Sequence, residues 1–179
     1  MIGRQREAVI LSLIEKLKCN DSWCGETHIQ KATYFLQELL KVPLELDFIL
    51  YKHGPYSFDL KDELNIMQSD MILKSISQLP YGSSLHPGDT SNQIKESYPI
   101  LISQYEKDID FVVQKLSRKN VSELEKLATA LYVTTSKKTD GSVEQRAESI
   151  NKVKPHVSIE AAKEAVITVD GFFAELSVA

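Results

Sequence analysis

The stretch FILYKHGPYSFDLKDELNIMQ (residues 48–68) contains the end of a strand signal, a turn signal and a helix start. Apolar and other residues alternate over residues 44–50, and this period of two predicts a strand. His53-Gly54-Pro55 is typical of a turn, and Ser57 is placed to cap a helix over residues 58–68. The stretch therefore predicts a strand and a helix joined by a short turn.

The flanking residues extend this pattern in both directions. Apolar residues recur at helical spacing over residues 8–17 and 28–40, and Thr27 is placed to cap the second of these helices. Residues 69–79 suit a second strand, and residues 81–91 are rich in Gly, Pro and Ser and suit a loop. The order helix, helix, strand, helix, strand, loop is that of a winged helix-turn-helix.

The rest of the chain is predicted to be helical. A stripe of apolar residues over residues 98–113 predicts one long amphipathic helix that ends at Asn120. Ser122 and Glu125 have the spacing of a capping box that would begin the next helix. Two more helices are expected at residues 142–153 and 158–176, the last one capped by its first residue, a serine.

Length and composition suit one globular domain. The chain has 179 residues, is 42% hydrophobic and 26% charged, and so is neither disordered, collagen-like nor dependent on a disulfide framework. We predict a mainly α fold with a small antiparallel β-hairpin (α+β), with a winged-helix-like part at about residues 1–90 and a helical part at about residues 91–179. Only short apolar runs occur, and the two cysteines suit a reducing compartment. We therefore expect a cytoplasmic protein that has no membrane partner.

Charge placement argues against nucleic acid as a partner. The net charge is −4, and residues 21–70 carry 4 basic and 9 acidic side chains. A recognition helix approaches phosphates closely, and Lys or Arg supplies that part of the affinity. The predicted third helix instead has Asp59, Asp62 and Glu63 against Lys61 alone. A DNA-binding regulator is kept as an alternative on architecture only.

Four segments resemble a known family. The first two are ETHIQKATYFLQ and FILYKHGPYSFDLKDEL, and the other two are LEKLATALYV and INKVKPHVS. Together they resemble bacterial YwgA-like proteins and the wider Panacea (SocA-like antitoxin) superfamily, over about residues 5–170. The matching motif residues are Gln30, Lys31, Tyr34, Phe35 and Gln37, then Tyr51, Gly54, Pro55, Tyr56, Ser57 and Leu60. Panacea domains are known chiefly as antitoxin modules, so the resemblance implies binding to a partner protein such as a toxin or a protease-associated protein.

The predicted partner-binding residues lie in the motif and in the polar loop before the second helix. They are Trp23, Tyr51, His53, Gly54, Pro55, Tyr56 and Ser57. A purely structural interpretation is also open, in which Gly54 and Ser57 shape the turn and the helix start. A hydrolase or nuclease with His53 as general base is a further alternative. Because no nucleophile or carboxylate accompanies His53 at a typical spacing, we predict that the protein is not an enzyme.

A metal site is the remaining alternative. Cys19, Cys24 and His28 form the pattern C-x4-C-x3-H, and a tetrahedral zinc site would need a fourth ligand such as His53 or His86. The alternative is two reduced thiols beside a helix start. The sequence also has no phosphate-binding loop and no dinucleotide fingerprint. We therefore predict neither a metal nor another cofactor.

Overall fold

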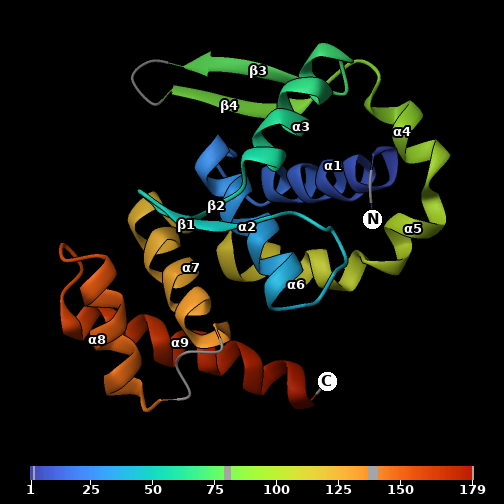
Figure 1. Cartoon of the computed structure of the whole chain (residues 1–179). Helices are drawn as coiled ribbons and strands as arrows, with labels where there is room; N and C mark the ends of the chain where they lie inside the picture. The colour runs from blue at the N-terminus through green and yellow to red at the C-terminus, as the bar shows by residue number, and fades with distance from the viewer. Residues whose placement is uncertain (2, 79–81, 137–140, 179) are drawn as a thin grey trace. The chain divides into compact units, whose positions relative to one another are not determined.

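The computed structural model describes residue 1 and residues 3–78, 82–136 and 141–178 (Figure 1). These residues form a mainly α structure with two small antiparallel sheets of two strands each, which confirms the predicted fold class. The chain divides into two compact units. The first contains residues 1–49 and 56–119, and the second contains residues 50–55 and 120–179. The predicted division near residue 90 falls inside the first unit.

The first unit is built around its first helix, which is buried because apolar residues occupy most of its surface. Residues Ala8–Leu11 are wholly buried, and so are Leu13, Ile14 and Leu17. This helix packs against four other helices and one strand of the unit. The helices in the described part of the unit are α1 (Arg4–Cys19), α2 (Glu26–Glu38), α3 (Phe58–Ser69), α4 (Ser91–Ser97), α5 (Pro99–Gln104) and α6 (Glu106–Leu116).

A hairpin of β3 (Leu73–Gln78) and β4 (Gly82–Pro87) follows α3 directly. The predicted second strand is therefore confirmed at β3. The predicted loop over residues 81–91 is wrong at residues 82–87, which form β4 against α1 (Figure 1), while residues 88–90 are irregular as expected. Residue 81 lies outside the described residues. The winged-helix assignment itself stays a prediction.

The predicted strand over residues 44–50 is confirmed at residues 49 and 50 and is wrong at residues 44–48. The only strand there is β1 (Ile49–Tyr51), which pairs with β2 (Gly54–Tyr56). The alternation is nevertheless real, because Leu44 and Leu46 are buried while Glu45 is exposed. Residues 44–48 alternate in burial but have no partner strand among the described residues. In place of one, the side chain of Gln37 forms hydrogen bonds with the N–H and the C=O of Leu46, each at 2.9 Å.

Two of the four helix starts for which the sequence predicts a capping side chain are confirmed. Ser57 Oγ accepts a hydrogen bond from the N–H of Leu60 at 3.2 Å, and Ser158 Oγ accepts one from the N–H of Ala161 at 3.2 Å. Each serine therefore satisfies one of the N–H groups that a helix start leaves unpaired.

The other two starts are wrong. Helix α2 begins one residue before Thr27, with Gly25 as its N-cap and no side-chain cap. Helix α7 is capped by Asn120, which forms the capping box with Glu123, so it begins before Ser122. Asn-x-x-Glu and Ser-x-x-Glu have the same spacing, and the sequence offers both.

The predicted long helix from residue 98 to Asn120 is also wrong as a single element. Tyr98 and Tyr105 leave helical geometry, with ψ of 43° and 9°, and they separate α4, α5 and α6. Pro99 starts α5 because proline suits the first position of a helix. The apolar stripe thus continues across a break that its spacing does not reveal.

The described residues of the second unit form three helices that pack against one another, and they confirm the predicted C-terminal helices. They are α7 (Val121–Thr135), α8 (Val143–Val153) and α9 (Ile159–Val178). The six-residue segment 50–55, taken from the middle of the first unit's sequence, belongs to this unit. None of the helices in the described part of the chain is both long and apolar enough to cross a membrane.

Candidate functional site

The predicted partner-binding residues fall into two different units. Trp23, Tyr56 and Ser57 belong to the first unit, whereas residues 51–55, with Tyr51, His53, Gly54 and Pro55, belong to the second. The motif that was one continuous segment in the sequence therefore contributes to two separate sites. Each site is built from different neighbours and offers different chemistry.

In the first unit, two aromatic side chains stand at the start of α3. Tyr56 is half-buried, and its hydroxyl donates a hydrogen bond to Glu26 Oε1 at 2.6 Å. The Phe58 side chain is 52% exposed, and its ring meets that of Tyr56 edge to face with 5.1 Å between centroids. An edge-to-face pair of this kind is favourable beyond the area that it buries. Both rings are thus held in place while remaining accessible.

Trp23 lies beside Gly25, the residue that precedes Glu26 at the start of α2. It is half-buried, and a side chain at Gly25 would place its Cβ 3.1 Å from the Trp23 ring. Gly25 therefore leaves room for the indole against the chain that leads into Glu26. We call Trp23, Glu26, Tyr56 and Phe58 the aromatic surface.

A groove of about 170 Å³ adjoins this surface, because Glu26 belongs to both. It runs between α3 and the β3–β4 hairpin, and its lining is mixed polar and apolar. Its lining residues are Glu26, Lys61, Leu64, Asn65, Gln68, Ser75, Ser83 and Leu85. The sequence did not predict this groove, because half of the hairpin that forms one wall was expected to be a loop.

The motif glutamines hold backbone in place. Gln30 is wholly buried, its Nε2 donates to the carbonyl of Ser57 at 2.8 Å, and its Oε1 accepts from the N–H of Ser57 at 2.9 Å. Gln37 bonds Leu46 in the same way. Each carboxamide thus supplies the donor and the acceptor that a neighbouring strand would supply.

Two further motif residues, Lys31 and Tyr34, are buried as well. Lys31 is 1% exposed, and the Tyr34 ring packs edge to face on Phe48 with 5.0 Å between centroids. Neither side chain is accessible to a partner in this conformation. The buried motif residues on α2 therefore support the aromatic surface from inside the unit and are not part of that surface.

In the second unit, a buried ion pair holds the turn between β1 and β2. Lys154 Nζ lies 3.2 Å from Glu125 Oε1, and both side chains are less than a tenth exposed. The same ammonium donates to the carbonyls of Tyr51, at 2.8 Å, and Lys52. Lys154 thus connects the turn to α7 through Glu125.

Two histidines flank the same carboxylate. His53 Nδ1 lies 3.5 Å from Glu125 Oε2, and His156 Nε2 lies 3.4 Å from Oε1. Their side chains are 58% and 62% exposed. The carboxylate that the sequence did not provide for His53 therefore comes from α7. We call Glu125, Lys154, His53 and His156 the polar cluster.

The residues of the possible zinc pattern do not converge. Cys19 is exposed, whereas the Cys24 thiol is buried, lies 3.7 Å from the Ile14 carbonyl, and has its pKa raised to about 11 by burial. His28 is buried with Nδ1 3.1 Å from Ser22 Oγ, and burial lowers its pKa to about 4. Among the described residues, no three His, Cys, Asp or Glu side chains form a group able to hold a metal ion.

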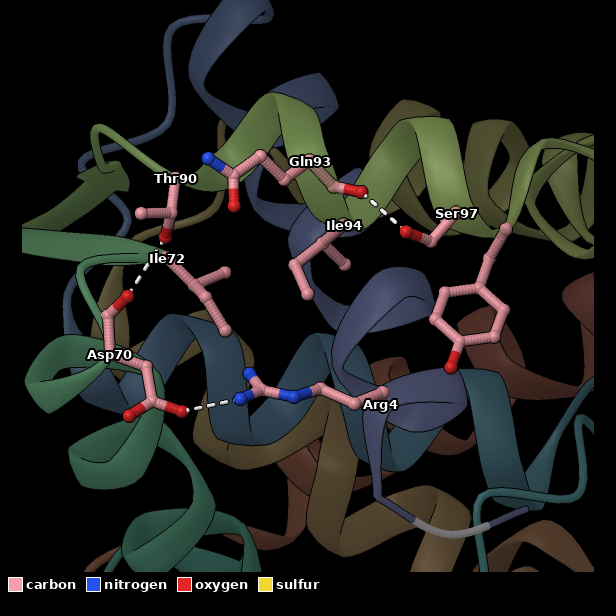
Figure 2. Close-up of a pocket in the computed structure, with 8 residues that line it drawn as sticks. Arg4, Asp70, Ile72, Thr90, Gln93, Ile94 and Ser97 are labelled. Atoms are coloured by element: carbon pink, nitrogen blue, oxygen red, sulfur yellow. Dashed lines mark hydrogen bonds and ion pairs between the residues drawn. The ribbon is translucent and has the colours of Figure 1, made fainter.

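A larger pocket of about 380 Å³ lies between α1, the end of α3 and α4 (Figure 2). At one side Arg4 Nη2 donates to Asp70 Oδ2 at 2.8 Å, and Thr90 Oγ1 donates to the Asp70 carbonyl at 2.8 Å. Glu7 and Asp70 bond the guanidinium and raise the pKa of Arg4. Because these two carboxylates already offset its charge, we assign no charged ligand to this pocket.

Comparison with protein-family models finds no matching family, and comparison with curated proteins finds no match. The function is therefore inferred from the chemistry of the residues described above. They offer an accessible aromatic surface with an adjoining groove in one unit, and a polar cluster around a buried carboxylate in the other.

Proposed function

We propose that this chain is a non-enzymatic protein-interaction module, antitoxin-like or regulatory, that binds a partner protein through the aromatic surface. The observation that carries this proposal is the pair of accessible rings, Tyr56 and Phe58, at the start of α3. Tyrosine and tryptophan are the residues that most often anchor protein interfaces. A toxin or a protease-associated protein is the partner class that the family resemblance implies.

The rigidity of this surface supports the proposal. Ser57, between the two aromatic residues, is wholly buried, caps α3 and is bonded on both backbone groups by Gln30. Side chains that are already ordered lose less conformational entropy when a partner binds. The buried motif residues thus give the aromatic surface a fixed shape.

Charge supports a protein partner over DNA. On α3, Asp59 and Asp62 are exposed beside Lys61, while Glu63 points inward and accepts from Arg6 Nε at 2.5 Å. The exposed charge of this helix segment is therefore negative, which would repel phosphates. A winged-helix DNA-binding regulator is the second candidate, and the hairpin directly after α3 is the observation that favours it. A specific, strongly salt-dependent mobility shift with the promoter of its own gene would support that candidate.

The first test is co-purification of the tagged chain with the products of neighbouring genes. We expect Tyr56→Ala to weaken binding of a captured partner by about tenfold or more, because it removes an interface anchor. Tyr98→Ala is the matched control, since Tyr98 is also half-buried but lies on the other pocket. Equal losses in both variants, or no neighbour bound by the wild type, would contradict the proposal.

A further inference from the structure

The β3–β4 hairpin has one covered edge and one open edge. Leu73 pairs with Pro87, which has no N–H, so this is a non-hydrogen-bonded pair. Because hydrogen-bonded and non-hydrogen-bonded pairs alternate, Ser75–Leu85 and Ser77–Ser83 are non-hydrogen-bonded too. The N–H of Leu85 indeed points away from β3 and donates to the Cys24 carbonyl at 2.9 Å.

The same alternation directs the backbone groups of Ser75 and Ser77 away from β4. Both residues are exposed, and no hydrogen bond to their outward N–H and C=O groups occurs within the described residues. In Figure 1, β4 lies between β3 and α1, so β3 is the outer strand. An edge of this kind presents the donors and acceptors that an added strand uses.

We infer that the β3 edge binds an extended segment of the partner protein as a third strand of this sheet. The inference rests on the proposed function and names how the partner is bound. Main-chain hydrogen bonds to Ser75 and Ser77 would give affinity, and side-chain contacts would give specificity. Strand addition at this edge requires no rearrangement of the hairpin, because the groups concerned are already unpaired and exposed.

The side chains on the two faces of β3 define the chemistry of that segment. Ser75 lines the groove, so Lys74 and Ile76 lie on the opposite face. Ile76 is 44% exposed, and Lys74 is exposed. Cross-strand neighbours interact most favourably when apolar residues and opposite charges are paired. The bound segment therefore has an apolar residue opposite Ile76, an acidic residue opposite Lys74, and a side chain between them that faces the groove.

A partner segment fits this edge better than a second copy of the chain. Two copies paired along β3 would bury only two short strand edges, well below the roughly 1,000 Å² that a specific interface needs. A segment of another protein also reaches the groove, which Glu26 connects to the aromatic surface. The larger contact favours the partner segment.

The test uses random octapeptides displayed on phage, selected against the full chain, with affinities measured by fluorescence anisotropy. Ser77→Pro removes an outward N–H without removing a bond to β4, and Ser77→Ala keeps that N–H. We expect Ser77→Pro to weaken peptide binding about tenfold or more, and Ser77→Ala to change it less than about twofold. Thermal melting of both variants checks that the hairpin and its unit remain folded.

A second measurement uses only the wild-type chain. Selected peptides carrying one N-methyl group at successive positions should lose binding at every second position, because only alternate N–H groups face β3. The inference is overturned if no peptide is enriched, if binding ignores both Ser77→Pro and N-methylation, or if the edge instead holds a wild-type dimer that Ser77→Pro dissociates. Should the co-purified partner still depend on Tyr56 in those cases, the proposed function stands and only the edge inference fails.

Discussion

Two stretches of irregular backbone are held in two different ways. In the first unit, the carboxamides of Gln30 and Gln37 bond the backbone of Ser57 and Leu46. In the second unit, the Lys154 ammonium, paired with Glu125, bonds the carbonyls of the β1–β2 turn. A neutral carboxamide satisfies both backbone groups by itself. A buried charge needs a second buried charge, so the second unit depends on two residues at once.

The largest expected effect follows from that dependence. Lys154→Met should lower the free energy of unfolding by about 3–5 kcal/mol, because it leaves Glu125 buried without its counter-charge. Urea denaturation followed by circular dichroism measures the loss, and Lys152→Met, at an exposed position, is the control. Adding Glu125→Gln to Lys154→Met should recover part of the stability. A double variant as unstable as the sum of the two single variants would show that the two charges do not support each other.

The first unit should respond to pH through one imidazole. Burial lowers the pKa of His28 from its ordinary value of 6.5 to about 4, so the unfolded chain binds a proton that the folded chain does not bind between these values. Stability is therefore complete above about pH 6.5 and falls by about 3 kcal/mol as the pH drops to about 4. Denaturation curves across this range measure it.

The control for this effect is His28→Gln, which carries no titrating group. Its unfolding free energy should change less steeply than that of the wild type between pH 6.5 and 4. Identical slopes in the two proteins would place the pH sensitivity elsewhere in the chain.

The next largest effect is expected for the carboxamides of Gln30 and Gln37, whose removal should lower the free energy of unfolding by different amounts. Gln30→Ala leaves the buried N–H of Ser57 unpaired and removes one of the two hydrogen bonds to its carbonyl, which keeps only the bond from the N–H of Lys61. It should cost about 2–3 kcal/mol. Gln37→Ala should cost less, because Gln37 and its two hydrogen bonds to Leu46 are only partly buried. Thermal melting of both variants ranks them. The reverse order would mean that burial does not decide the strength of these contacts.

The smallest expected effect concerns the helix starts. Ser57→Ala should cost about 1 kcal/mol, the usual value for a lost N-cap. Thr27→Ala is the matched control, since the sequence predicts a cap at Thr27 and the structure has none there. Its unfolding free energy should be nearly that of the wild type. A comparable loss at both positions would contradict the assignment of the two helix starts.

The parts of the fold that depend on local signals were predictable from the sequence. The apolar stripe of α1 and the cap at Ser57 are examples, because both arise from residues within a few positions of each other. The segment 41–48 was not, since period-two burial is identical with and without a partner strand. Likewise β4 was not predicted, because its Gly, Ser and Pro content is typical of a loop. Contacts with α1 and a hydrogen bond to the Cys24 carbonyl, which the local sequence does not reveal, hold this strand.

The candidate sites were predictable only in part, for a similar reason. Tyr56 and Trp23 were identified from residue type and local context, and both are at least partly accessible. Glu125, which faces His53, lies 72 residues further along the chain. No spacing rule connects positions so far apart. The open edge of β3 was also out of reach, because it depends on the register of a hairpin that the sequence did not predict.

The assignment of residues 50–55 to the second unit has a consequence for synthesis on the ribosome. The turn is held by Lys154, which is made 103 residues after Tyr51. At the usual rate of 5–20 residues per second, the turn waits about 5–20 s for the side chain that fixes it. Until then the nascent chain carries an unanchored turn, so the second unit is complete only after translation of nearly the whole chain.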